Sequence, residues 1–169
     1  MSEAVLTDLR AVLAEVVDPE IPVLTIEDLG VLRDVVVDQA GKVTVTITPT
    51  YSGCPAMDVI RRSIVEVLRR QGHSEVDVRT ALSPAWTTDW MSEAGKRKLR
   101  EFGIAPPGPA RSGPVFVDLT ARAASPREVR CPNCGSADIR EVSRFGSTAC
   151  KSLWTCNACL EPFDHFKAI

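Results

Sequence analysis

Apolar residues recur along the first hundred or so positions with two spacings, and each spacing predicts one kind of element. A return every three or four residues, as at Leu6, Leu9 and Leu13, indicates an amphipathic helix. Strict alternation, as in the run VTVTIT over residues 43–48, indicates a strand with one buried face. These patterns predict an order α-β-β-α-β-α, with elements at residues 4–17, 31–37, 43–48, 55–70, 75–82 and 89–102.

Prolines and glycines mark where these elements end. Asp18-Pro19 ends the first helix, because the residue before a proline avoids helical backbone angles. Residues 105–114 hold four prolines and two glycines and form the best domain boundary. Residues 115–119 predict a short strand that fits either side of this boundary. The expected fold class is α/β, a small mixed sheet with packed helices, plus a C-terminal zinc ribbon; the domains are 1–107 and 126–169, joined by a linker or bridging segment at 108–125.

Composition narrows the class of protein and its partners. The chain is 44% hydrophobic and 25% charged, with a formal net charge of −2 and no strongly basic segment, which disfavours nucleic acid as a partner. No stretch approaches the ~20 apolar residues of a membrane span, and the first residues lack the apolar core of a secretory signal. We therefore expect a cytoplasmic protein without a membrane partner, in which cysteines bind metal or react rather than form disulfides.

Five of the six cysteines gather in the tail, and four of them form two CxxC pairs. Two facing CxxC turns place four thiolates at the corners of a tetrahedron, the geometry of structural zinc sites. The sequence thus predicts zinc ligands at Cys131, Cys134, Cys156 and Cys159. Iron is also suited to four thiolates, and a redox CxxC or cysteines that only pack are the alternatives. The remaining tail cysteine, Cys150, is interpreted as a buried small residue, with a ligand role as the alternative.

Cys54 lies apart from the tail, in TYSGCP at the predicted start of the second helix. A helix N-terminus favours a thiolate, so Cys54 is either a reactive thiol or an inert buried cysteine. Asp18 and Glu20 are read either as a helix end followed by a solvated turn, or as carboxylates beside Cys54. Thr50 is likewise either a strand-face threonine or a pocket hydroxyl.

Several short stretches of the first domain resemble the MIP-eighteen-like metal–sulfur cluster assembly family, which includes SufT-like proteins. The matching stretches are Asp18-Pro-Glu-Ile-Pro22, Leu29-Gly30, Thr50-Tyr-Ser-Gly-Cys-Pro55, Leu82-Ser-Pro-Ala-Trp-Thr87 and Gly103-Ile-Ala-Pro-Pro107. The resemblance implies a small α/β fold. It places the family's signature cysteine at Cys54 and its acidic motif at Asp18 and Glu20.

The tail extends the likeness over nearly the whole chain. With CPNCGS (131–136), FGSTACKSLWTC (145–156) and EPFDHFK (161–167), the sequence is similar to the PaaD family, the small subunits encoded with the phenylacetyl-CoA epoxidase. This resemblance implies a non-catalytic role in bacterial aerobic phenylacetate breakdown, in maturation of the iron–sulfur or di-iron centres of the oxygenase complex.

The resemblance also implies partners and cofactors. The expected partners are the oxygenase and reductase subunits as protein clients, together with cluster scaffold proteins; a homodimer stays open. The expected cofactors are zinc in the ribbon and a transient iron or iron–sulfur cluster at Cys54. The alternative function is a structural subunit of the oxygenase complex, with no chemical role.

Overall fold

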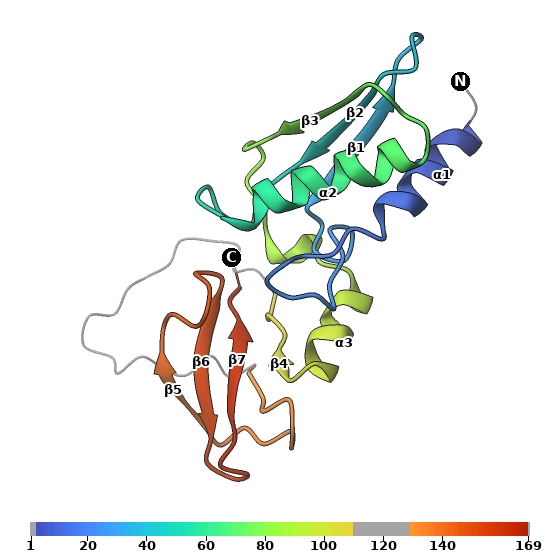
Figure 1. Ribbon diagram of the computed structural model, residues 1–169. Coiled ribbons are helices and arrows are strands. Elements are labelled where there is room, and N and C mark those ends of the chain that lie inside the picture. Colours follow the sequence, from blue (N-terminus) through green and yellow to red (C-terminus); the bar gives the residue numbers. More distant parts are fainter. Residues whose placement is uncertain (1–2, 110–128, 169) are drawn as a thin grey trace. The chain divides into compact units, whose positions relative to one another are not determined.

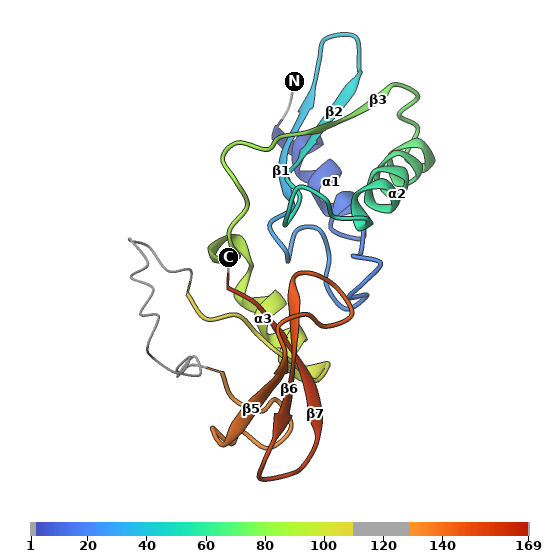
Figure 2. The same cartoon turned by 90° about the vertical axis from the view of Figure 1, so that its left-hand side faces the viewer.

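The computed structural model describes residues 3–109 and 129–168, so the strand expected at 115–119 lies outside the described residues. The chain divides into two units (Figures 1 and 2). The first comprises residues up to 86 together with 90–95, and the second comprises 87–89 together with residues from 96 onward. Within the described residues, no helix combines the length and the apolar character needed to cross a bilayer.

The first unit is a three-stranded mixed sheet with two helices on one face (Figure 1). The strand order is β1-β2-β3, with β1 antiparallel to β2 and β2 parallel to β3. Its elements are α1 (Glu3–Leu13), β1 (Leu32–Val37), β2 (Val43–Ile47), α2 (Ala56–Arg70) and β3 (Val76–Thr80). The chain thus forms the predicted β-β-α-β succession, and the pairing supplies the strand order that periodicity alone does not contain.

The alternation of β2 sets the core of this unit. Val43, Val45 and Ile47 are fully buried, whereas the two intervening threonines are half-buried on the opposite face. The apolar stripe of α2 packs onto the buried face through Met57, Ile60, Ile64 and Leu68. Every second residue of β2 and every third or fourth residue of α2 point to the same interface. The sheet and the helix therefore form two layers with one shared core between them.

The first helix is shorter than the sequence predicts: α1 ends at Leu13, not at residue 17. Beyond it the backbone closes a tight loop, in which Val17 pairs with Thr25 as an isolated bridge. Asp18 N–H donates to the carbonyl of Leu24 at 2.8 Å. The amides of Glu15 and Val16 donate three residues back, to the carbonyls of Val12 and Leu13, so the helix tightens and ends before the proline.

The third predicted helix is interrupted. A short 3₁₀ helix, η1 (Thr88–Trp90), precedes α3 (Glu93–Glu101) instead of one helix over 89–102. Ser92 stands between them, and its Oγ accepts the N–H of Gly95 at 2.8 Å. A serine hydroxyl in this position satisfies a first-turn donor, so it starts a new helix at Glu93.

The second unit is a four-stranded sheet of order β4-β7-β6-β5 (Figure 1). Its strands are β4 (Ile104–Ala105), β5 (Ile139–Ser143), β6 (Lys151–Cys156) and β7 (Pro162–Phe166). The expected first domain ended at residue 107, yet β4 pairs in parallel with β7 of the tail. The small core of this sheet joins apolar side chains to two of the tail cysteines: Ala105, Val129, Trp154, Phe163, Cys131 and Cys156.

Candidate functional site

The two CxxC segments of the tail form turns of the same construction. In the first, Cys131 N–H donates to the carbonyl of Ser136 at 3.0 Å. In the second, Cys156 N–H donates to the carbonyl of Glu161, also at 3.0 Å and also five residues on. The residue after each pair has a left-handed backbone, with φ of 75° at Gly135 and 64° at Leu160. The second turn therefore places a leucine where the first has glycine.

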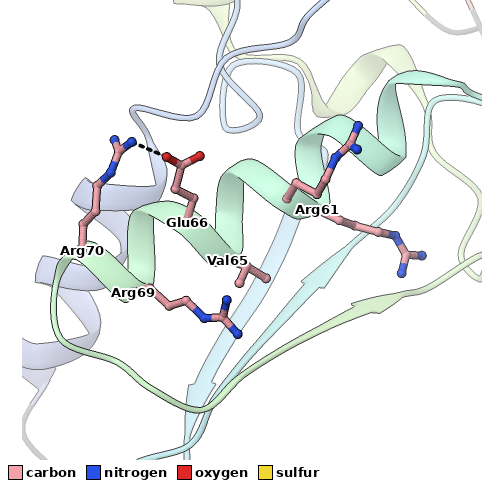
Figure 3. Close-up of a pocket in the computed structure, with 6 residues that line it drawn as sticks. Arg61, Val65, Glu66, Arg69 and Arg70 are labelled. Atoms are coloured by element: carbon pink, nitrogen blue, oxygen red, sulfur yellow. Dashed lines mark hydrogen bonds and ion pairs between the residues drawn. The ribbon is translucent and has the colours of Figure 1, made fainter.

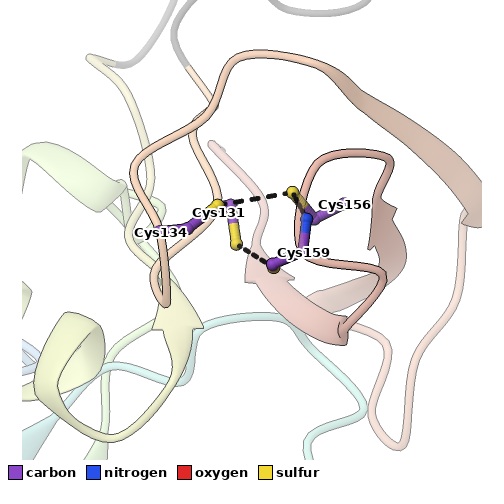
Figure 4. A group of neighbouring side chains, drawn as sticks. All are labelled: Cys131, Cys134, Cys156 and Cys159. Carbon is purple, nitrogen blue, oxygen red and sulfur yellow. Dashed lines mark hydrogen bonds between the residues drawn. The ribbon is translucent and has the colours of Figure 1, made fainter.

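These turns bring the four sulfurs together (Figure 4). Cys131 Sγ lies 3.7 Å from Cys159 Sγ, and Cys134 Sγ lies 3.5 Å from Cys156 Sγ. All four ligand atoms lie within 4.8 Å of one another. Thiolates bound tetrahedrally about 2.3 Å from one zinc or iron ion stand about 3.8 Å apart, so this cluster fits a single four-coordinate metal. The tail thus carries a metal-binding cluster of four cysteines.

Hydrogen bonds and crowding separate the acidities of these thiols. The backbone N–H of Cys159 lies 3.5 Å from Cys156 Sγ, and it is the largest influence lowering the pKa of Cys156 to about 7. For Cys159, the N–H of Glu161 lowers the pKa, but burial and the three neighbouring thiols outweigh it and raise the pKa to about 12. Four thiols this close cannot all ionise without a cation among them, which is the condition a bound metal relieves.

The strands behind the cluster hold a buried polar group. His165 Nδ1 lies 3.3 Å from Ser152 Oγ, which accepts the indole N–H of Trp154 at 2.9 Å. The imidazole meets the Trp154 ring edge-on, with ring centroids 5.9 Å apart. His165 Nε2 is buried without a hydrogen-bond partner among the described residues. Burial, followed by the charge of Lys167, lowers the pKa of His165 to about 4, so this side chain is neutral near pH 7.

Cys54 lies in the connection from β2 to α2, where the sequence placed it. Its N–H donates to the carbonyl of Tyr51 at 3.1 Å, and its own carbonyl accepts the N–H of Met57 at 3.3 Å. Pro55 caps α2 and already has helical angles, with φ of −69° and ψ of −23°. The side chain is half-buried. The thiol therefore stands at a helix N-terminus with part of its surface open to solvent.

Asp18 and Glu20 lie in the connection that enters β1. Asp18 Oδ1 accepts the N–H groups of Glu20 at 2.8 Å and Ile21 at 2.9 Å, and the residue is 8% exposed. Glu20 is exposed. Asp18 thus closes a buried turn five residues beyond the end of α1, not the solvated turn at a helix end that was one of its two interpretations.

The acidic residues and the thiol belong to the same end of the first sheet. Thr48 N–H donates to the carbonyl of Val31 at 2.9 Å, which joins the chain leaving β2 to the chain entering β1. The half-buried Thr50 lies in the same connection as Cys54. A joint role of these residues with Asp18 and Glu20 stays a prediction.

Cys150 stands between β5 and β6, outside the four-cysteine cluster. Its half-buried Sγ lies 3.0 Å from Thr148 Oγ1. Its carbonyl accepts the N–H of Lys167 at 2.9 Å, which extends the β6–β7 pairing by one step at the end where β6 starts and β7 finishes.

The periodicity did not identify the contacts that tie the 81–95 segment to the connection before β1. Trp86 is buried, and its indole N–H donates to the carbonyl of Leu29 at 2.9 Å. Gly30 has φ of 66°, and a Cβ there would lie 2.5 Å from the carbonyl oxygen of Trp90. Both partners of the Trp86–Leu29 bond lie in stretches that resemble the cluster assembly family, Leu29-Gly30 and 82–87, so the resemblance was the sequence signal for this contact.

Fold and site together define a class of two-module protein. A small α/β domain with one thiol at a helix start is joined to a ribbon whose four thiols form a closed metal-binding cluster. Residues 6–82 match the family described as "Iron-sulfur cluster assembly protein", and residues 118–167 match the "PaaD zinc beta ribbon domain".

The match over the whole chain narrows this class. The chain is 46% identical over 162 residues to a putative 1,2-phenylacetyl-CoA epoxidase subunit of Escherichia coli K12, which covers 96% of this chain and 92% of that relative. The chain belongs to the PaaD family of phenylacetyl-CoA epoxidase subunits.

The first module also has relatives of its own. It is 39% identical over 93 residues to an "Fe-S protein maturation auxiliary factor" of Porphyromonas gingivalis, which covers 54% of this chain and 88% of that protein. A crystal structure of a "Domain of Unknown Function DUF59" from Bacillus anthracis superposes with a TM-score of 0.54 at 32% identity, over 57% of this chain and 92% of that one. The likeness supports the α/β fold of the first module.

Proposed function

We propose that this protein is an accessory factor that matures the iron–sulfur or di-iron centres of a multicomponent phenylacetyl-CoA epoxidase in bacterial aerobic phenylacetate breakdown. It would act on protein clients in the cytoplasm and would not catalyse the epoxidation. One observation carries the proposal: a half-buried thiol at the start of α2 lies on the same chain as a separate four-thiol cluster. The names of the relatives, an epoxidase subunit and maturation factors, support it.

In this proposal the ribbon holds zinc and is structural. Cys131, Cys134, Cys156 and Cys159 would fill all four positions around the ion, which leaves no open position for chemistry. The metal would supply folding energy to a sheet whose apolar core is small. The ribbon would then present a fixed surface to a client or to a cluster scaffold protein.

The chemical role falls to Cys54. A thiolate is a soft ligand for iron, and the N-terminus of the 15-residue helix α2 favours its charged form. The cargo, iron or an iron–sulfur cluster, would be held there only transiently. Of the two acidic residues at this end of the sheet, Glu20 is exposed, whereas Asp18 is buried and bonds its own turn. Glu20 and Thr50 are therefore the better candidates for a second contact with the cargo.

The test measures iron and labile sulfide in the purified oxygenase and reductase subunits. These subunits are taken from cells that carry this protein as wild type, as a deletion, or as Cys54→Ser. Cys150→Ser is the matched control, since it removes another half-buried cysteine that lies outside the cluster. We expect under-metallated clients from the deletion and from Cys54→Ser, and normal iron from Cys150→Ser.

The deficient subunit would identify the client. If iron is normal in every strain but the complex dissociates without this protein, the chain is a structural subunit and the maturation role is wrong. If the deletion lowers client iron but Cys54→Ser does not, the accessory role stands and the role of Cys54 is wrong.

A further inference from the structure

The exposed side of α2 carries a row of arginines beside a shallow open groove. The groove has a volume of about 580 Å³ (Figure 3). Two successive ridges of the helix line it, each built from residues four apart: Arg61, Val65 and Arg69 in one, and Arg62, Glu66 and Arg70 in the other. We call this surface the arginine groove.

Two of these arginines already have partners within the first unit. Arg70 forms an ion pair with Glu66, one turn before it on the helix. Arg61 donates to Thr80 Oγ1 at the end of β3. Arg62 and Arg69 form no ion pair with any described residue, and both are exposed. Figure 3 shows Arg69 on the side of the helix away from the Glu66–Arg70 pair. Two guanidinium groups are thus available to a ligand that supplies acceptors.

The spacing of these two groups limits the ligand. Arg69 comes seven positions after Arg62, which is about 10 Å along the helix axis. In an extended peptide, carboxylates on one face at positions i and i+4 stand about 13 Å apart, within reach of two long arginine side chains. Val65 lies between the arginines and offers an apolar contact for an intervening side chain. Guanidinium groups bind carboxylates with two parallel hydrogen bonds, which gives such a site directional preference.

The same surface argues against a nucleic acid. A continuous phosphate backbone would have to pass Glu66, which lies within the row, and the whole chain has a formal net charge of −2. Discrete carboxylates can instead flank Glu66, each at its own arginine. We propose that the arginine groove docks an acidic, extended segment of a partner protein.

This proposal rests on the proposed function only in taking that partner to be a client. Arg62 lies about 9 Å along α2 from the helix start at Ala56, next to Cys54. A segment docked in the groove would lie along the helix that begins two residues after Cys54, which would place its protein near the proposed cargo site.

The test uses the full chain and a fluorescent peptide of about nine residues, rich in threonine and valine, with glutamates at positions i and i+4. The same peptide with glutamines and a single-stranded oligonucleotide are the comparison ligands. The variant R62Q/R69Q is matched by R97Q/R100Q, which removes two exposed arginines of α3. Equal thermal unfolding of the variants establishes that each is folded.

We expect the glutamate peptide to bind with an affinity that falls as salt is added. The glutamine peptide should not bind. R62Q/R69Q should lose up to about fivefold in affinity for each arginine, as for a solvent-exposed ion pair, while R97Q/R100Q binds as wild type. The proposal is overturned if the peptide fails to bind, if both double variants weaken it equally, or if the oligonucleotide binds more tightly than the peptide.

Client iron content separates this proposal from the proposed function. Loss of iron in Cys54→Ser but not in R62Q/R69Q would leave maturation standing and reject the groove as the client site. Specific peptide binding together with normal client iron in Cys54→Ser would leave the arginine groove standing as a binding site and reject the chemical role of Cys54.

Discussion

Asp28 and Ser92 lie 64 residues apart and are joined by two hydrogen bonds. Ser92 Oγ donates to Asp28 Oδ1 at 2.9 Å, and Ser92 N–H donates to the carbonyl of Asp28 at 2.9 Å. The same hydroxyl accepts the N–H of Gly95, so one serine both starts α3 and fixes that start to the connection before β1. The second carboxylate oxygen of Asp28 accepts the N–H of Thr25 at 3.2 Å. A single aspartate therefore both closes a turn in the connection before β1 and ties that connection to the start of α3.

Replacing Asp28 with alanine should lower the free energy of unfolding by about 1–3 kcal/mol. The change leaves the Ser92 hydroxyl and the Thr25 amide without their acceptor in a largely buried site. Urea unfolding measures the loss. Glu27→Ala removes the same charge from the exposed neighbouring residue and should change stability by less than about 0.5 kcal/mol. Equal losses in the two variants would reject the structural role of Asp28.

Gly30→Ala should be more destabilising than Gly41→Ala. Both glycines have positive φ, 66° and 86°, so both variants incur the left-handed penalty of about 1–2 kcal/mol. Only at Gly30 would the new Cβ meet another group, the carbonyl oxygen of Trp90 at 2.5 Å, whereas nothing lies within 4 Å at Gly41. Urea unfolding measures both variants. The difference between their free energies of unfolding gives the cost of the clash between the new Cβ at residue 30 and the 90–95 segment. No difference would show that this segment moves away at no cost.

The strands and the second helix of the first unit could be predicted from the sequence, because their apolar residues recur with a regular period. The alternation around Val45 and the stripe containing Ile60 each describe one face of one element, and the structure confirms both. Where α1 ends and how α3 starts depended on partners distant in sequence or on single hydrogen bonds, such as Ser92 to Asp28. The hydrogen bond from Ser92 to Asp28 spans 64 residues, so no window of a dozen residues contains it.

The four-cysteine cluster should bind about one zinc ion per chain. Cys134→Ser should lower the bound zinc well below one ion per chain, since a closed tetrahedral site needs all four thiolates. Cys54→Ser and Cys150→Ser should retain it, because neither sulfur belongs to the cluster. Elemental analysis of the purified variants measures zinc and iron together. Iron in place of zinc in the wild type would reject the zinc assignment while leaving the ligand set intact.

Chelation of this metal should loosen the second sheet before the first. The core beside the cluster is small and includes Cys131 and Cys156 themselves, so metal loss removes part of it. Hydrogen exchange after chelator treatment should therefore accelerate in β6 and β7 while β1 and β2 stay protected. Uniform acceleration in all four strands would contradict this independence.

The second sheet should lose stability as the pH falls from about 6.5 to 4. His165 has a pKa of about 4 when folded, chiefly because it is buried, against an ordinary value of 6.5. Between these values the unfolded chain binds the proton and the folded chain does not, so protonation favours unfolding. The stability that comes from keeping His165 neutral is fully present above pH 6.5. About 3 kcal/mol of the free energy of unfolding is lost between pH 6.5 and pH 4.

His165→Phe tests this dependence. Unfolding is measured from pH 7 down to pH 4 for wild type and variant at the same excess of zinc, since loss of metal at low pH affects both. The wild-type curve should fall more steeply than that of the variant. Parallel curves would show that the imidazole has the same pKa in the folded and the unfolded chain, which would reject the prediction.

Leu160→Gly should raise the stability of the zinc-loaded ribbon by up to about 1 kcal/mol. Leu160 adopts φ of 64°, which disfavours a branched side chain, and 76% of its surface is exposed, so little packing is lost. Gly135→Leu, the reverse change in the matching turn, should destabilise by a similar amount. A less stable Leu160→Gly ribbon would mean that the leucine side chain packs in solution.

The four-cysteine cluster could be predicted from spacing alone, because two CxxC pairs form two turns whatever the rest of the sheet does. The proposed cargo site could not be predicted in the same way. Whether Asp18 and Cys54 act together depends on which connections share one end of the sheet, and that follows only from the antiparallel pairing of β1 with β2. The arginine groove required the extent of α2 and the partners already taken by Arg61 and Arg70.

The two-residue strand β4 limits how the chain can be divided. Ile104 and Ala105 precede all four prolines of the segment 105–114, yet they cover one edge of β7. A fragment beginning after that segment would keep all four metal ligands but would expose β7 as a bare edge. Bare edges pair with other chains. The metal alone therefore does not make the tail an autonomous module, and a fragment that begins before residue 104 is the better choice for studying the ribbon in isolation.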